Sequence, residues 1–376
     1  MDERPADRHR REKAERAHTW KDHLYGLIHF PRRLRNMASD LDFLIMRLEK
    51  LHRVTEIEHS YARAQIDRIW AEVRDNTAAR HQLKQSGYDL AREIAARGKN
   101  APVPPDADPD LSLGSKPSTQ EDIESDWFYY WMAELRLAPL AHRKLWEMAY
   151  MLQQLYARDK LKPGMKALGF GCGEEPMPSY FAAKGMDVTV TDLHPEAVAD
   201  LGWVETGQHT DSLMATHKPG LVDEATFRRH VELEYVDMND IPASLDGRYD
   251  ICWSICALEH LGSIKQGLDF IENSLETLKP GGVAVHTTEF NFTYPDRTID
   301  NWMTVLFRRS DFEGIAARLE AKGHKVAPLN FDVGDQPMDR FIDLPPYHLP
   351  SHHLKLSVDG YPSTCFGITV EKDGLR

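Results

Sequence analysis

The sequence predicts an α/β protein with a mostly parallel sheet and a helical N-terminal extension. Three observations predict it: a Leu-rich helical pattern before residue 100, a Pro- and Asp-rich stretch after it, and short apolar runs that alternate with helical patterns from residue 165 onward. Strands that alternate with helices form βαβ units with right-handed crossovers. A length of 376 residues favours one large domain with an accessory segment.

The first 100 residues are predicted to be helical. Leu41, Leu44, Leu48 and Leu51 recur at steps of three and four residues, the spacing of one helix face. The repeat weakens after Val54, so we expect a short coiled coil or a helical hairpin. These helices are candidates for homo-oligomer formation.

The N-terminus is locally basic, with ten Lys and Arg against six Asp and Glu in residues 1–35. Residues 23–35, HLYGLIHFPRRLR, have the composition of an amphipathic helix that could make a weak membrane-surface contact, or pack on its own protein. We expect a cytoplasmic protein, since no apolar run approaches the roughly 18–20 residues that span a bilayer.

A linker is predicted for residues 101–120, which concentrate Pro, Asp and Ser with little to bury. The catalytic domain is expected to occupy 121–376, beginning with two helices between Asp126 and Tyr156.

Charge and cysteine content narrow the class of protein. The formal net charge of −13 opposes general binding of nucleic acid. The tetrapeptide that starts at Leu344, LPPY, resembles one in DNA adenine methyltransferases, but its apolar first residue indicates a turn. Four cysteines without a CxxC pair indicate no disulfide framework, and we predict no required metal.

The chemistry is predicted to lie at the carboxyl ends of the strands, where sheets of this class bind ligands. The first apolar run ends in GFGCG, and Gly171 and Gly173 would allow a sharp turn and close approach of a ligand. The second run ends at Asp192, where a carboxylate can accept hydrogen bonds from both ribose hydroxyls. Asp237 and Met238 end the third run, and could bind an adenine amino group and pack on its ring.

These motifs, with ALEHL at 257–261 and LKPGG at 278–282, resemble in order and spacing the class I S-adenosylmethionine-dependent methyltransferases. The resemblance implies a Rossmann-like seven-stranded, mostly parallel sheet whose last strand, near 365–370, is antiparallel. It implies S-adenosyl-L-methionine as the cofactor. The implied cofactor-binding residues are Gly171, Cys172, Gly173, Glu175, Asp192, Leu193, Asp237, Met238 and Ser254.

Two positions depart from the family pattern. Gly169 stands where an acidic residue is usual, and Glu175 where a third loop glycine is usual. A binding protein that keeps the fold without turnover is therefore an alternative. A dinucleotide-binding oxidoreductase fits less well, because that class needs the third glycine to bring a helix N-terminus to the pyrophosphate.

The predicted catalytic residues are His260, His286 and Glu289. The resemblance puts His260 beside the transferred methyl group, where an imidazole can accept a hydroxyl proton at neutral pH. His286, Glu289 and Asn291 lie in a polar stretch at the end of the fifth apolar run and are candidates for substrate contact.

A looser resemblance, carried by residues 250–292 and 353–372, is to bacterial methyltransferases associated with glycosyltransferases and cell-surface polysaccharide synthesis. It implies a sugar hydroxyl of a glycan or nucleotide sugar as methyl acceptor. The alternative acceptor is a small metabolite or lipid.

Overall fold

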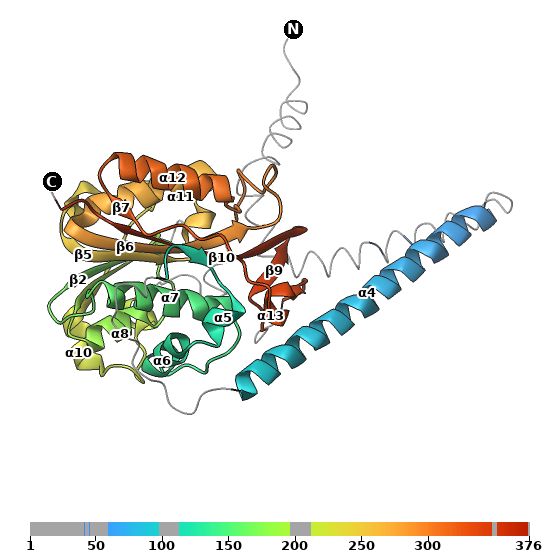
Figure 1. Cartoon of the computed structure of the whole chain (residues 1–376), viewed down its shortest axis with the longest axis horizontal. Helices are drawn as coiled ribbons and strands as arrows, with labels where there is room; N and C mark the ends of the chain where they lie inside the picture. The colour runs from blue at the N-terminus through green and yellow to red at the C-terminus, as the bar shows by residue number, and fades with distance from the viewer. Residues whose placement is uncertain are drawn as a thin grey trace, which may run out of the picture.

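The computed structural model describes residues 41, 45, 59–97, 113–195, 212–347 and 352–374. A mixed sheet lies at its centre, with helices on both faces (Figure 1). Its strand order is β4-β3-β2-β5-β6-β10-β9-β8, and β1 and β7 also pair with β10. The α/β prediction is confirmed, but the sheet has ten strands rather than seven.

The inner strands form a parallel ladder because each is followed by a crossover segment. The strands are β1 (Lys116–Pro117), β2 (Lys166–Phe170), β3 (Asp187–Asp192), β4 (Val231–Tyr235), β5 (Tyr249–Ile255), β6 (Leu278–Asn291), β7 (Lys325–Val326), β8 (Ile342–Asp343), β9 (Lys355–Val358) and β10 (Tyr361–Glu371). The ladder from β4 to β6 is parallel throughout. Strand β10 is antiparallel to β6, as predicted.

Helices cover both faces of the sheet, and a separate apolar core lies on each face. Helices α6 (Asp126–Glu134), α7 (Arg143–Ala157), α8 (Met177–Ala183) and α10 (Glu224–His230) lie on one face, and α11 (Ile264–Ser274) and α12 (Arg309–Ala321) on the other (Figure 1). Two short helices, α5 (Gln120–Ile123) and α13 (Pro337–Arg340), lie near the β10 side. The prediction of two helices between Asp126 and Tyr156 matches α6 and α7.

Residues 113–120 are part of the folded domain, although the sequence predicted a linker. Lys116 and Pro117 pair with Gly367 and Phe366 of β10. Ser115 and Ser118 are fully buried. A short polar strand on the edge of a sheet has no apolar alternation, so its sequence reads as a linker.

Helix α4 (His59–Ala96) is 38 residues long and leans out from the domain (Figure 1). Its C-terminal part docks through Ala91 and Ile94, which are buried, and through Lys84, whose Nζ lies 2.7 Å from Asp343 Oδ1. The Leu repeat of the predicted coiled coil and the basic stretch at 23–35 fall almost wholly outside the described residues. No described helix combines the length and apolarity needed to cross a bilayer.

Candidate functional site

The loop after β2 turns on two glycines with left-handed backbone. Gly171 has φ +58° and Gly173 has φ +51°, a region that favours glycine because it has no Cβ. A Cβ on Gly171 would lie 2.8 Å from Ala257 Cβ and 3.4 Å from Met238 Sδ. The ends of β2, β4 and β5 therefore converge here, with room only for glycine.

Asp192 ends β3 beside this loop and is 5% exposed. Its Oδ2 accepts a hydrogen bond from the Gly173 amide at 3.1 Å, and its Oδ1 accepts one from the Leu193 amide at 2.9 Å. These contacts fix the carboxylate against the loop.

The end of β4 supplies one apolar and one polar residue. Met238 is buried and lies against Gly171, whereas Asp237 is exposed and its Oδ1 accepts from the Asn239 amide at 2.8 Å. An apolar surface beside an exposed carboxylate suits the ring and amino group of an adenine.

The two departures from the family pattern both lie against one side chain, the indole of Trp253. A Cβ on Gly169 would lie 2.4 Å from Trp253 Cζ2 and 2.3 Å from Cys172 Sγ, so the ring and the thiol together exclude any larger residue at 169. The indole Nε1 donates to Glu175 Oε1 at 2.5 Å. Burial raises the pKa of Glu175 to about 8, which keeps this carboxyl largely neutral at pH 7.

The thiol of Cys172 lies in the same loop and is 3% exposed. Burial, with Glu175 and Asp192 nearby, raises its pKa well above the ordinary value. Cys172 is therefore a neutral thiol in the loop.

The structure places Ser254 and His286 away from the predicted site. They are paired residues of β5 and β6, both fully buried on the α11 face of the sheet. His286 Nδ1 bonds Ser254 Oγ at 2.8 Å and its Nε2 bonds Ser274 Oγ at 3.0 Å. Burial lowers the pKa of His286 to about 3. These two assignments are corrected: a neutral histidine with both ring nitrogens engaged in the core cannot serve as a substrate contact.

His260 ends the short 3-10 helix η4 (Leu258–His260), just beyond Ala257. Its Nδ1 lies 2.8 Å from the Met303 carbonyl oxygen and 3.3 Å from Thr304 Oγ1. A carbonyl can only accept, so in the neutral ring the proton sits on Nδ1 and the Nε2 atom carries the lone pair.

Glu289 lies near the end of β6 on the opposite face from His286, toward α7. Arg143, at the start of α7, forms an ion pair with it, and Ser363 Oγ donates to Glu289 Oε2 at 2.8 Å. Asn291 instead holds the following loop, because its amide contacts the backbone at Thr293, Tyr294 and Arg297.

The start of α7 brings further polar groups to the carboxyl ends of β5 and β6. Glu147 is fully buried and accepts from Thr287 Oγ1 at 2.7 Å, and Glu259 accepts from Thr288 Oγ1 at 3.1 Å. Buried Arg143 Nε has no hydrogen-bond partner among the residues that the structure describes. Sequence reasoning missed Arg143 and Glu147, although two charged residues one turn apart in an otherwise apolar helix were a usable signal.

The electrostatics of this cluster are balanced by neighbouring charges of opposite sign. Burial opposes ionisation of Arg143 and Lys144, but the nearby acidic groups outweigh it, so both pKa values are raised and both side chains are cations. Burial opposes ionisation of Glu147 too, but these two cations lower its pKa. Burial raises the pKa of Glu259.

The glycine loop, the carboxylate at the end of β3 and the buried methionine at the end of β4 fit an adenosine-containing ligand. The fold and site define a domain that binds a nucleotide-like cofactor, with a cluster of buried polar side chains beside the cofactor residues. The comparison with known families agrees: residues 144–321 match the model of a family described as a methyltransferase domain. The matched residues identify this part of the chain as a methyltransferase domain.

Comparison with solved structures finds similar folds at low identity. One is a carbon methyltransferase, CurJ, with 16% identity, TM-score 0.33, and coverage of 62% of this chain and 54% of that protein. Another, from Aquifex aeolicus, is S-adenosylmethionine-dependent and has 18% identity, TM-score 0.30, and coverage of 56% and 84%. A third, from Methanosarcina mazei, has 13% identity, TM-score 0.35, and coverage of 56% and 94%. No curated protein matches the chain.

Proposed function

We propose that the protein transfers a methyl group from S-adenosylmethionine to a hydroxyl of a sugar, in a glycan or a nucleotide sugar. The supporting observation is the cluster of polar side chains formed by Arg143, Glu259 and Glu289, in which the buried Arg143 Nε lacks a hydrogen-bond partner among the described residues. An unpaired buried N–H is costly, and a substrate oxygen would satisfy it. Carboxylates and a guanidinium suit an acceptor rich in hydroxyl groups.

The cofactor supplies an electrophilic methyl group, and this chain's residues bind and align it. In the proposal Gly171, Cys172, Gly173 and Glu175 form the loop beside its methionine part. Asp192 and Leu193 contact the ribose, and Asp237 and Met238 flank the adenine. Alignment of the acceptor with the methyl carbon supplies most of the rate advantage, since the displacement is in line.

His260 is the proposed general base. The Met303 carbonyl fixes the proton on Nδ1, so Nε2 is the atom that accepts the hydroxyl proton as the new O–C bond forms. Glu289, held by Arg143 and Ser363, is the proposed acceptor contact. The looser resemblance to polysaccharide-associated methyltransferases supports the same acceptor class.

The test has two stages. Calorimetric titration of the full chain with S-adenosylmethionine, its demethylated product and NAD should show binding of the first two only. Transfer of a labelled methyl group is then screened against nucleotide sugars, oligosaccharides, small hydroxylated metabolites and lipids. Transfer to metabolites or lipids alone would refute the sugar assignment, and cofactor binding without transfer to any of these acceptors would favour a scaffold.

His260→Ala should leave the dissociation constant of the cofactor unchanged and slow turnover about 100-fold or more, the usual contribution of a positioned base. Tyr235→Ala, which removes an exposed ring at the end of β4, is the control for surface substitution near the site. Full activity of the His260 variant would remove it from the mechanism.

A further inference from the structure

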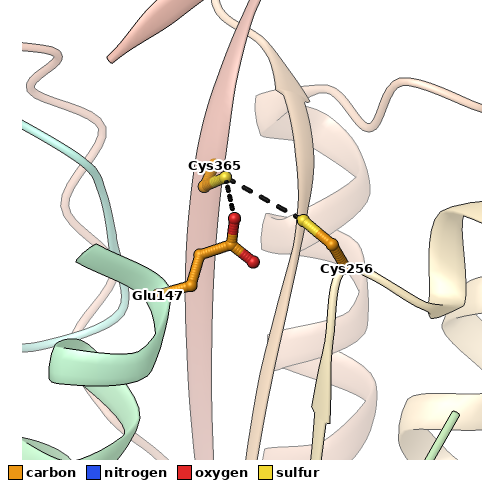
Figure 2. A group of neighbouring side chains, drawn as sticks. All are labelled: Glu147, Cys256 and Cys365. Carbon is orange, nitrogen blue, oxygen red and sulfur yellow. Dashed lines mark hydrogen bonds between the residues drawn. The ribbon is translucent and has the colours of Figure 1, made fainter. Parts of the chain in front are cut away.

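Two thiols and a carboxylate from three separate segments meet beside the polar side chains of Glu259 and Glu289. We define the thiol cluster as Glu147 of α7, Cys256 just after β5, and Cys365 of β10. Figure 2 shows Glu147 and Cys256 both directed toward Cys365. The two Sγ atoms are 3.9 Å apart, and Cys365 Sγ lies 2.5 Å from Glu147 Oε1. One ligand atom from each residue lies within 4.8 Å of the others.

We propose that the thiol cluster binds a thiophilic divalent cation, Zn²⁺ in the first instance. Zinc is held tetrahedrally by thiolates at about 2.3 Å, which sets two ligand sulfurs about 3.8 Å apart. The sulfur separation in the cluster is 3.9 Å, so the two cysteines already stand at the edge length of such a tetrahedron. Glu147 supplies the third ligand.

A fourth ligand is within reach on the other side of Cys256. Ligand atoms of Cys256, Glu259 and Glu289 also lie within 4.8 Å of one another. Glu289 is held by Arg143 and Ser363, whereas Glu259 has Thr288 as its side-chain partner, so Glu259 is the carboxylate that can turn to the metal. Two thiolates and two carboxylates would complete the coordination.

The cationic side chains beside the cluster do not exclude the metal, because Zn²⁺ replaces two thiol protons and the total charge is unchanged. Arg143 Nη1 lies 3.1 Å from Cys365 Sγ and 4.0 Å from Cys256 Sγ, so it stands as a hydrogen-bond donor beside both sulfurs. Lys144 Nζ lies 3.6 Å from Glu147 Oε1. Burial raises the pKa of both cluster thiols, so without metal they are neutral. When Zn²⁺ enters, each thiol loses its proton to solvent and two Zn–S bonds form; the two positive charges gained equal the two protons released. Arg143 keeps its ion pair with Glu289.

The backbone at Cys256 supports a constrained role for this side chain. Its φ is +47°, a left-handed conformation that is uncommon for a residue other than glycine. Hydrogen bonds from its amide to the Thr287 carbonyl, at 3.0 Å, and to Thr287 Oγ1, at 3.2 Å, hold that conformation. Backbone strain of this kind is concentrated at functional sites.

Cobalt is the spectroscopic probe, because Co²⁺ bound to thiolate shows sulfur-to-metal charge-transfer absorption and Zn²⁺ bleaches it. The full chain, reduced with a phosphine and freed of metal, is titrated with Co²⁺ and then with Zn²⁺. We expect a stoichiometric charge-transfer band that Zn²⁺ abolishes. Absence of the band in the folded wild-type protein would overturn the proposal.

Substitution of each cysteine tests whether its sulfur binds the metal. Cys256→Ser and Cys365→Ser should each reduce the charge-transfer intensity at least about twofold and weaken Co²⁺ binding about 10-fold or more, the usual effect of changing a metal site. Cys252→Ala, which removes another buried thiol on the α11 face, should bind Co²⁺ as the wild type does. A band that survives both serine substitutions would place the metal elsewhere and overturn the assignment.

A wild-type measurement covers the case in which the serine variants fail to fold. Calorimetric titration of Zn²⁺ in buffers of different ionisation enthalpy counts the protons released on binding. We expect about two protons per Zn²⁺ bound, one from each thiol. Binding with no proton release would refute thiolate ligation. Cofactor binding is measured separately, so failure here leaves the proposed methyl transfer untouched.

Discussion

At the scale of single residues, strand alternation decides which polar groups can reach a ligand. His286 and Glu289 lie three positions apart in β6, so their side chains point to opposite faces of the sheet. The sequence placed both residues in the polar stretch at the end of the fifth apolar run, which made both candidates for substrate contact. The strand continues to Asn291, so His286 lies in its interior and only Glu289 faces the α7 side.

Asp192→Ala is expected to weaken S-adenosylmethionine binding about 10- to 100-fold, because hydrogen bonds to a carboxylate contribute about 1.5–3 kcal/mol. Calorimetry of the variant measures this change. Asp246→Ala, at an exposed position after β4, is the matched control. Unchanged affinity in a folded Asp192 variant would show that the ribose binds elsewhere.

Glu175→Gln should make folding stability less dependent on pH. The pKa of Glu175 is raised from 4.5 to about 8 in the folded protein, so the native state binds more protons than the unfolded state between those values. The contribution of Glu175 to the free energy of unfolding therefore falls as pH rises through this window. Glutamine still accepts from Trp253 without ionising.

The measurement for Glu175 is urea unfolding of both proteins at pH 5 and pH 9. The free energy of unfolding of the variant, relative to that of the wild type, should be at least about 1 kcal/mol higher at pH 9 than at pH 5. This is part of what the full pKa shift of Glu175 would give. Parallel stability curves would show that the carboxyl ionises without penalty in the folded state.

At the scale of elements, apolar periodicity predicted the long, buried strands and missed the short strands at the edge of the sheet. The patterns at 187–192 and 249–254 coincide with β3 and all but the last residue of β5. Strands β1 and β8 have two residues each, too few to show alternation. The candidate site divides in the same way: the glycine loop and Asp192 have local sequence signatures, whereas Arg143, Glu147 and Cys365 come together only through the packing of α7 on β10.

Gly367→Ala tests that packing. A Cβ at 367 would lie 2.2 Å from Tyr150 Cε1, and the Tyr150 hydroxyl is itself fixed by bonds to the Gly114 and Gly367 carbonyls. We expect a loss of about 1–3 kcal/mol in the free energy of unfolding, the cost of overpacking a core. Gly314→Ala in α12, where nothing lies within 4 Å, should stabilise by up to about 1 kcal/mol. Equal effects in thermal or urea unfolding would contradict this packing.

At the scale of the whole molecule, the segment before α6 belongs to the domain core. Asp122 is buried and accepts a hydrogen bond from Trp146 Nε1 at 2.8 Å. It also forms an ion pair with Lys116 at 2.7 Å. Gln120 and Lys355 both contact Asp339 of α13. The bond from Gln120 ties α5 to an element more than two hundred residues away in the sequence.

Two truncations separate the accessory helix from the core. A chain starting at residue 113 should fold and bind cofactor, with some loss of stability because Asp343 loses Lys84 while keeping His353. A chain starting at residue 125 should fail to fold, since Trp146 loses its hydrogen bond to Asp122, Asp339 loses the one from Gln120, and β10 loses its pairing with β1. Circular dichroism and calorimetry measure both. A folded shorter chain would mean that β1 and α5 are dispensable.

The outer edge of β10 is divided among three short strands from distant parts of the chain: β9 at its start, β1 in the middle and β7 at its end. A long strand with unpaired backbone groups is a template for pairing with another molecule, and proteins protect such edges against aggregation. Here the eleven residues of β10 present no continuous edge to a second chain. Displacement of β1 would therefore expose the middle of this edge to pairing with a second molecule.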